Sequence, residues 1–299
     1  MTVVFEQVLL LILFAAVGYA LCGFKLADSK HTKLLSTMEI YVFLPCTVYN
    51  TFSKNFTPEY LTQKYILLIA SAVILIILVA VAHFGAKLLT KDDYRRKIYA
   101  YSLTVPNYGY MGYALAGALF GTEGLLNIMV FSLPVSMYVY TVAYCMLTKT
   151  KLNLKRLANP ILLSMLVGMV VGLLQVKTPS VLATLAEKGA ACMAPVSMLL
   201  AGMVISEYHV LPLLKNGANY LVAGLRLVVL PCAISGILRL VGLEDVVIPA
   251  LTLYCMPCGL NTVVFPKLIG EDCKTGASLA VISSLASCLT IPLCVWLFT

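Results

Sequence analysis

The chain has 299 residues, of which 61% are hydrophobic and only 11% are charged, and its formal net charge at pH 7 is +8. Its mean hydropathy of +0.95 lies far above the values of soluble domains. These figures exclude a soluble globular protein, and the positive charge needs no nucleic acid to explain it. We expect an integral membrane protein whose basic residues meet anionic lipid headgroups.

Apolar segments of about 17 to 24 residues follow one another along the chain, and each is long enough to cross roughly 30 Å of hydrocarbon as a helix. We predict ten such spans, at residues 4–22, 34–52, 65–88, 98–120, 125–147, 160–176, 190–206, 220–241, 246–268 and 275–298. The connections are short and polar, so the predicted fold is an all-α integral membrane protein. Glu6 stands where a signal peptide would carry basic residues, and we predict that the first helix is retained.

Lysine and arginine are distributed unevenly between the predicted loops. With the amino terminus outside, the inner loops hold fifteen: Lys25, Lys30, Lys33, Lys87, Lys91, Arg95, Arg96, Lys97, Lys149, Lys151, Lys155, Arg156, Lys215, Lys267 and Lys274. The outer loops hold five: Lys54, Lys64, Lys177, Lys188 and Arg239. Because cytoplasmic loops are enriched in these residues, the sequence predicts a multi-pass protein of the cell membrane with both termini outside.

Two spans carry a proline and then an asparagine at their middles. The fourth contains Val105-Pro106-Asn107-Tyr108-Gly109, and the ninth contains Met256-Pro257-Cys258-Gly259-Leu260-Asn261. Proline removes a backbone donor and clashes with the preceding turn, so we predict that both helices are interrupted there. The freed polar groups persist in hydrocarbon only beside protein or a watery cavity. Such paired interruptions indicate the substrate site of a transporter near the bilayer midplane.

Prolines also recur at related positions roughly 150 residues apart, which indicates an internal repeat. The pairs are Pro45 with Pro195, Pro106 with Pro257, and Pro134 with Pro292. We therefore predict two five-helix repeats, at residues 1–148 and 160–299, joined by a short basic cytoplasmic linker at 149–159, with further helix breaks at Pro45 and Pro195. Because five is odd, the second repeat enters the membrane from the opposite side and is inverted. Chance recurrence of prolines is the alternative.

The residues at the two interruptions predict an anion site. Asn107 is suited to cap the half-helix that begins near Tyr108, and Asn261 or Thr262 the half-helix of the ninth span. A helix start offers unpaired N–H groups and a partial positive charge, which favour a carboxylate. Backbone freedom for close approach comes from Gly109, Gly112 and Gly259. Capping without ligand contact is the simpler alternative for both asparagines.

Three titratable side chains within predicted spans are candidates for function. Arg226 lies about ten residues into the eighth span, where a charge usually faces a cavity or a partner; we consider both contact with an anionic substrate and pairing with carbonyls or Glu39. Glu39 is a candidate carrier of a coupling proton if burial keeps it protonated, or else a wetted residue near the inner mouth. His83, one turn before Lys87, is a second proton candidate or a solvated helix end.

Patterns typical of catalysis or of a cofactor are missing from the sequence. Cys255 and Cys258 form a C-x-x-C, but no second cysteine pair or histidine cluster completes a metal or redox site. There is no G-x-x-x-x-G-K-[ST] loop for a nucleotide, and no nucleophile with a base at shared depth. We predict neither an enzyme nor a bound metal or cofactor.

Three stretches resemble the auxin efflux carrier family of membrane transport proteins, which includes plant auxin exporters and bacterial permeases for malate or malonate. They are VPNYGYMGYALAGALFG at 105–121, MPCGLNTVVFPKLIGED at 256–272 and FLPC at 43–46. The short central loop is similar to the bacterial branch. The resemblance implies a ten-helix inverted repeat in which the fourth and ninth helices cross at their broken middles, with the substrate held near the crossing.

These observations predict a secondary active or facilitative transporter of a small organic anion, such as malate, malonate or an auxin-like acid, that works by alternating access. Coupling to H⁺, to Na⁺ or to neither stays open. A sodium-coupled symporter of the bile-acid kind and a non-transporting receptor or scaffold are the alternatives. Gly168 and Gly172 form a G-x-x-x-G that serves either a homodimer or internal packing.

Overall fold

The computed structural model describes residues 2–207, 214, 216–267 and 269–298, and these are helical, with no β-strand among them. The prediction of an all-helical chain is confirmed. Lys215, one of the predicted inner cations, lies outside the described residues.

The first half of the chain forms the following helices. They are α1 (Thr2–Gly23), α2 (Ser29–Met38), α3 (Leu44–Asn55), α4 (Pro58–Lys64), α5 (Ile66–Leu89), α6 (Asp93–Thr104), α7 (Tyr113–Tyr138) and α8 (Tyr144–Thr148). Wider π-helical turns join some of them without a gap: η1 (Glu39–Phe43) joins α2 to α3, η2 (Tyr108–Gly112) leads into α7, and η3 (Val139–Ala143) joins α7 to α8.

The second half follows a 3₁₀ turn, η4 (Leu154–Leu157). Its helices are α9 (Pro160–Leu173), α10 (Ser180–Ser206), α12 (Gly217–Gly224), α13 (Leu230–Leu240), α14 (Glu244–Tyr254), α15 (Asn261–Lys267) and α16 (Lys274–Phe298). The π-helical turn η5 (Leu225–Val229) joins α12 to α13.

Six stretches of the described residues are long and apolar enough to cross a membrane, compared with the ten predicted spans. They are Phe5–Gly23, Ile66–Leu89, Tyr108–Thr148, Ser180–Ser206, Gly217–Leu240 and Lys274–Phe298. The stretch Tyr108–Thr148 bends at Gly121, whose φ of 65° and ψ of −159° are not helical. The remaining predicted spans coincide with short or interrupted helices, such as α9 with 14 residues and α14 with 11.

Polar residues fix where several helices begin at the ends of the spans. Asp28, Asp92 and Asn159 each accept hydrogen bonds from backbone N–H groups in the first turn of α2, α6 and α9. The pKa of the Asp28 carboxyl is lowered, chiefly because the backbone N–H of His31 bonds to it. These caps satisfy donors that a helix start leaves without a partner.

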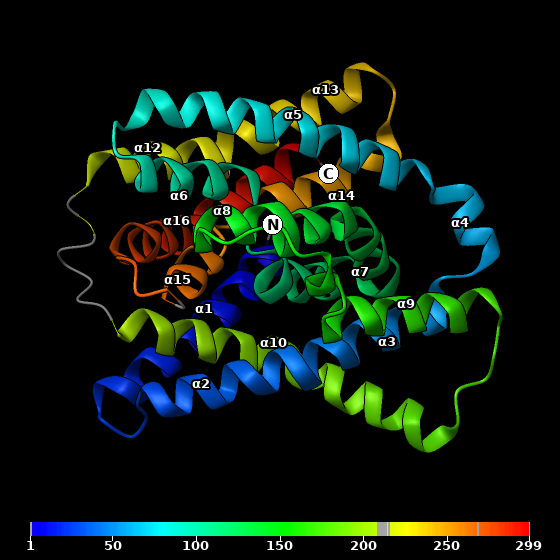
Figure 1. Cartoon of the computed structure of the whole chain (residues 1–299). Helices are drawn as coiled ribbons and strands as arrows, with labels where there is room; N and C mark the ends of the chain where they lie inside the picture. The colour runs from blue at the N-terminus through cyan, green and yellow to red at the C-terminus, as the bar shows by residue number, and fades with distance from the viewer. Residues whose placement is uncertain (1, 208–213, 215, 268, 299) are drawn as a thin grey trace.

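The helices form two layers (Figure 1). We call α1, α2, α3, α9 and α10 the first layer and the remaining helices, α4–α8 and α12–α16, the second layer. In the first layer α1 packs on α10, and α3 packs on both α9 and α10; in the second, α5 packs on α6 and α7, and α12 on α16. Each layer contains helices from both halves of the chain.

The G-x-x-x-G of α9 lies against α3. A methyl group added at Gly172 would come within 2.6 Å of the backbone oxygens of Phe52 and Phe56, and one added at Gly168 within 2.9 Å of the Phe52 side chain. The two small residues therefore let α9 and α3 approach closely. Internal packing accounts for this motif.

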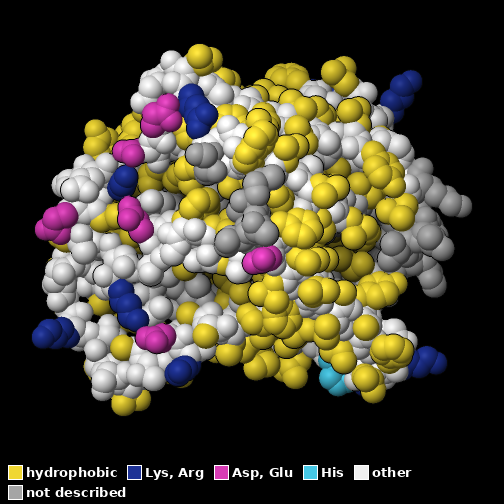
Figure 2. All heavy atoms as spheres, turned by 180° about the vertical axis from the view of Figure 1, so that it is seen from behind, with side chains coloured by type: hydrophobic (Ala, Val, Ile, Leu, Met, Phe, Trp, Pro, Cys, Tyr) yellow, Lys and Arg dark blue, Asp and Glu magenta, His cyan; other side chains and the backbone are white. Residues whose placement is uncertain are grey.

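Much of the outer surface is apolar, as expected for a protein surrounded by lipid. Leu88, Leu240 and Leu289 are 89%, 88% and 73% exposed. Figure 2 shows apolar side chains over much of one face, with most of the charged side chains at its edges. A soluble monomer rarely exposes so large an apolar area. With the apolar helices described above, this surface indicates a multi-pass membrane protein.

Candidate functional site

The two motifs predicted to interrupt helices lie back to back at the centre of the molecule. α6 ends at Thr104 and η2 begins at Tyr108, while α14 ends at Tyr254 and α15 begins at Asn261. The intervening residues pair through an isolated antiparallel bridge between Pro106 and Cys258.

Direct backbone contacts join these two connecting segments. The Asn107 N–H donates to the Pro257 carbonyl over 2.8 Å. A methyl group added at Gly259 would come within 3.3 Å of the Pro106 carbonyl oxygen, which is closer than most side chains tolerate. Proline explains why neither segment is helical, and glycine explains why they can touch.

The backbone groups around this contact have partners. The Cys258 N–H donates to Ser283 Oγ over 2.9 Å, and the Asn107 carbonyl accepts from the N–H groups of Met111 and Gly112. Irregular backbone at membrane depth is stable only when its polar groups are satisfied in this way or face water.

A first cavity of about 120 Å³ lies beside the contact, and we call it the tyrosine cavity. Its lining comes from both layers: Ile40, Leu44, Pro106, Asn107, Tyr108, Gly109, Tyr110, Tyr113, Ser136, Tyr140, Asn159, Ile161, Gly259, Leu260, Asn261, Val264 and Phe265. Tyr108 OH and Ser136 Oγ are 2.8 Å apart, and the rings of Tyr108 and Tyr113 meet edge to face with centroids 5.7 Å apart. These contacts hold the aromatic wall in place.

A second cavity of about 210 Å³, the apolar cavity, lies on the side of α1 and α10. It is lined by Ile12, Ala15, Ala16, Tyr19, Asn107, Met111, Met198, Ala201, Gly202, Ile205, Leu260, Val281, Ser284 and Leu285. Asn107 and Leu260 line both cavities. Within the part of the chain that the structure describes, neither lining includes a charged side chain.

Five of the predicted binding residues share the tyrosine cavity: Asn107, Tyr108, Gly109, Gly259 and Asn261. The capping roles differ from those predicted. The Asn107 side chain makes no capping bond to the helix that follows, and the Asn261 side chain donates to the hydroxyl of Tyr101 over 2.9 Å. Thr262 is fully buried, and its hydroxyl donates to the Gly259 carbonyl. It lines neither cavity.

Arg226 also lies outside both linings. It is fully buried in η5, where Nη1 donates to the Leu103 carbonyl over 3.2 Å and the guanidinium lies 5.4 Å from the centre of the Tyr254 ring. Of the two roles considered from the sequence, the geometry agrees with pairing to a carbonyl. It does not place this charge beside a ligand in either cavity.

Glu39 is the first residue of η1, Pro45 follows η1 at the start of α3, and Pro195 lies within α10. Glu39 is fully buried; its Oε1 accepts a hydrogen bond from Ser197 of α10, while its Oε2 has no partner among the described residues. Pro45 is the second residue of α3, and the chain stays helical from Ser29 through η1 to Asn55, so the predicted break at Pro45 is not seen. α10 runs through Pro195 as one helix, in contrast to the predicted break, because a helix packed on both sides tolerates one missing donor.

His83 lies on the exposed face of α5 and packs edge to face against Phe84. It lines neither cavity. Four polar residues that were not predicted as binding residues also line the tyrosine cavity: Tyr110, Tyr113, Ser136 and Tyr140. The only available signal was the density of tyrosines after Pro106 and in the fifth span.

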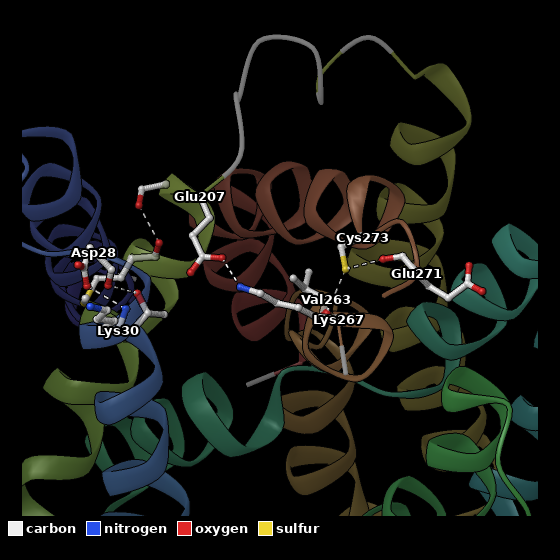
Figure 3. A network of polar contacts seen from close by, with 10 residues as sticks. Asp28, Lys30, Glu207, Val263, Lys267, Glu271 and Cys273 are labelled. Carbon is white, nitrogen blue, oxygen red and sulfur yellow. Dashed lines mark hydrogen bonds and ion pairs between the residues drawn. The ribbon is translucent and has the colours of Figure 1, made fainter. Parts of the chain in front are cut away.

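Ion pairs connect the end of α15 to its surroundings (Figure 3). Lys267 Nζ lies 2.5 Å from Glu207 at the end of α10, so this pair bridges the second layer and the first. Lys149 pairs with Glu271 within the second layer. Cys273 Sγ donates to the carbonyls of Val263 and Glu271 at 3.4 Å, which holds the turn after α15.

Comparison with known proteins agrees with this geometry. The family model for membrane transport proteins matches residues 3–152 and 147–295. The chain belongs to this family. The resemblance to auxin efflux carriers is thereby confirmed, and the family is one of transporters rather than of enzymes. An uncharacterized transporter of Methanocaldococcus jannaschii is 28% identical over 124 residues, which cover 40% of this chain and 39% of the relative. The match spans less than half of either protein.

Proposed function

We propose that the protein carries a small organic anion across the membrane by alternating access, as a secondary active or facilitative transporter. The observation that supports this most strongly is the hydrogen-bonded contact between residues 105–107 and 255–260, which separates two cavities and contributes Asn107 and Leu260 to both. A site at the meeting point of two interrupted helices can open to one side of the membrane and then to the other when the layers move.

The proposed architecture is two inverted repeats, residues 1–148 and 160–299, joined by the linker 149–159. The composition of the layers supports it. The first layer takes the opening helices of each half, and the second layer takes the later ones. The fourth and ninth spans then cross at their interruptions. In the predicted orientation, with both termini outside, Asn159 of the tyrosine cavity and Ile205 of the apolar cavity lie toward the cytoplasm, so this conformation opens inward.

The proposed ligand contacts favour an anion with a single carboxylate. The N–H groups of Tyr108, Gly109 and Tyr110 precede the first bond within η2, whose start at Asn107 faces both cavities. The apolar cavity suits a carbon skeleton. Because the described linings hold no cationic side chain, a second carboxylate would lose its hydration without a partner. We expect an auxin-like monocarboxylate to be preferred to malate or malonate.

Proteoliposomes that contain the purified protein test this proposal. We expect saturable uptake of a radiolabelled monocarboxylate, compared with malate, malonate and protein-free liposomes. Ligand-dependent thermal stabilisation without uptake would favour a receptor or scaffold. Uptake that requires a sodium gradient would favour the alternative of a sodium-coupled symporter of the bile-acid kind. Absence of both binding and uptake for every carboxylate would overturn the proposal.

We further propose that Glu39 carries a proton in the coupled form of this transport. It lies in η1, where Ser197 of α10 donates to Oε1 and where Oε2 has no partner among the described residues and is open to a proton. Replacing Glu39 by Gln is expected to remove the effect of an imposed pH gradient on uptake, while His83→Gln leaves that effect unchanged. A wild-type protein that ignores the pH gradient would contradict the coupling and leave facilitative transport.

A further inference from the structure

The structure describes two charged side chains as fully buried, Glu39 and Arg226, and Arg226 is the one in the second layer. It is the tenth residue of the apolar stretch Gly217–Leu240 and therefore lies near the middle of that span. Its Nε and Nη2 have no hydrogen-bond partner among the described residues. Such a charge is costly in a membrane and needs a compensating field.

The groups that face the guanidinium belong to the last residues of two helices: one is a carbonyl and the other is an aromatic ring. Leu103, whose carbonyl accepts from Arg226 Nη1, is the penultimate residue of α6, and Tyr254, whose ring faces the guanidinium, is the last residue of α14. The carboxyl end of a helix carries a partial negative charge that stabilises a nearby cation, but the helix dipole has no net charge, so the guanidinium keeps its full charge in the membrane field. Both helices end immediately before the interruptions. Arg226 thus contacts the last turns of α6 and α14, next to the crossing, and lines neither cavity.

We infer that Arg226 is a built-in countercharge that crosses the membrane field together with the bound anion. This inference rests on the proposed function. α6, α14 and η5 all belong to the second layer, so a movement of that layer moves the guanidinium and the ligand at Asn107 as one body. With a monoanion bound, the buried formal charge of the layer is zero. Empty, the layer carries one positive charge.

A consequence is that the membrane potential acts on the empty layer and not on the loaded one. One elementary charge moved through 100 mV changes an equilibrium by roughly 50-fold if it crosses the whole field. Net uptake includes the return of the empty layer and therefore depends on the potential. Exchange of external for internal substrate uses the loaded layer alone, and with a monoanion it is independent of the potential.

The test is exchange in proteoliposomes, with radiolabelled indole-3-acetate as the monoanion and malate as the dianion, under a potassium-diffusion potential of about 100 mV. Arg226→Lys retains the charge and serves as the matched control for Arg226→Gln. We expect monoanion exchange to ignore the potential in the wild type and in Arg226→Lys, and to change several-fold in Arg226→Gln. If Arg226 had only a structural role, Arg226→Gln would change the rate of monoanion exchange but would not make that rate depend on the membrane potential.

The wild type alone provides a second test if Arg226→Gln does not fold. Malate leaves one uncompensated negative charge on the loaded layer, so malate exchange must depend on the potential while indole-3-acetate exchange does not. Monoanion exchange that depends on the potential in the wild type, or is independent of it in Arg226→Gln, overturns the inference and leaves transport itself intact. Absence of any wild-type exchange overturns the proposed function as well.

Discussion

The two motifs at residues 105–109 and 256–261 both contain proline, glycine and asparagine, yet their surroundings differ. After residues 105–107 the chain enters η2 and the long helix α7, and Asn107 lines both cavities without capping the helix. After residues 255–260 the chain forms only the seven-residue α15.

The segment at residues 255–260 is followed by α15, which is held by contacts at both of its ends. Asn261 donates to the buried Tyr101, and Lys267 pairs with Glu207 of the first layer. We therefore expect the two similar motifs to have different roles. In the proposed function, residues 105–107 offer an amide side chain and helix N–H groups to a ligand, while residues 255–260 fix the position of that segment.

The largest expected effect comes from separating the two segments. Gly259→Val would place side-chain atoms against the Pro106 carbonyl, and overpacking of this kind costs about 1–3 kcal/mol. We expect a lower melting temperature in detergent and loss of uptake. Gly236→Ala is the matched control, because a methyl group there meets nothing within 4 Å. Normal uptake by Gly259→Val would contradict the close contact.

A pair of asparagine substitutions tests the difference between the interruptions directly. Asn107→Ala is expected to reduce uptake by about tenfold or more, since an amide at the ligand is lost, while stability changes less than in Asn261→Ala because the Asn107 side chain makes no capping bond. Asn261→Ala leaves the Tyr101 hydroxyl buried without its donor and is expected to cost about 1–3 kcal/mol of stability. Uptake assays and thermal unfolding of both variants would separate the two roles. Equal effects on both measurements would show that the segments are equivalent.

The smallest expected effect concerns the ion pair between the layers. Lys267→Glu places two carboxylates together at an exposed site, where a pair is worth about 0.2–1 kcal/mol, so uptake should change only a few-fold. Combining it with Glu207→Lys restores the opposite charges and should restore the rate, as a double-mutant cycle would measure. Additive effects in the cycle would mean that the pair does not brace α15.

Much of the candidate site could be located from residue chemistry. Proline at 106 and 257 marks segments that cannot continue a helix, and Gly259 marks a place where another backbone can approach. The tyrosines at 110, 113 and 140 could not be selected in this way. Their part in a cavity depends on which side of a helix faces the crossing, and the chain has 17 tyrosines to choose from.

For Pro195 and Arg226, the residue type alone did not predict the structure. Pro195 has the same chemistry as Pro106, but α10 continues through it because helices pack around that part of the chain and tolerate one missing bond. Arg226 could be recognised as a costly charge in the middle of a span, but its partners, Leu103 and Tyr254, are far away in the sequence or on another helix.

The sequence by itself determined that the chain is helical and apolar enough for lipid, belongs among membrane transport proteins, and carries two proline-containing segments at related positions. These properties follow from hydrophobicity, helix length and the missing proline N–H, all of which are local. The tertiary structure alone decided that the segments touch, that Asn107 lines two cavities, and that Arg226 donates to the Leu103 carbonyl. Those outcomes depend on packing between distant helices, where small residues permit contact and buried polar groups must find partners.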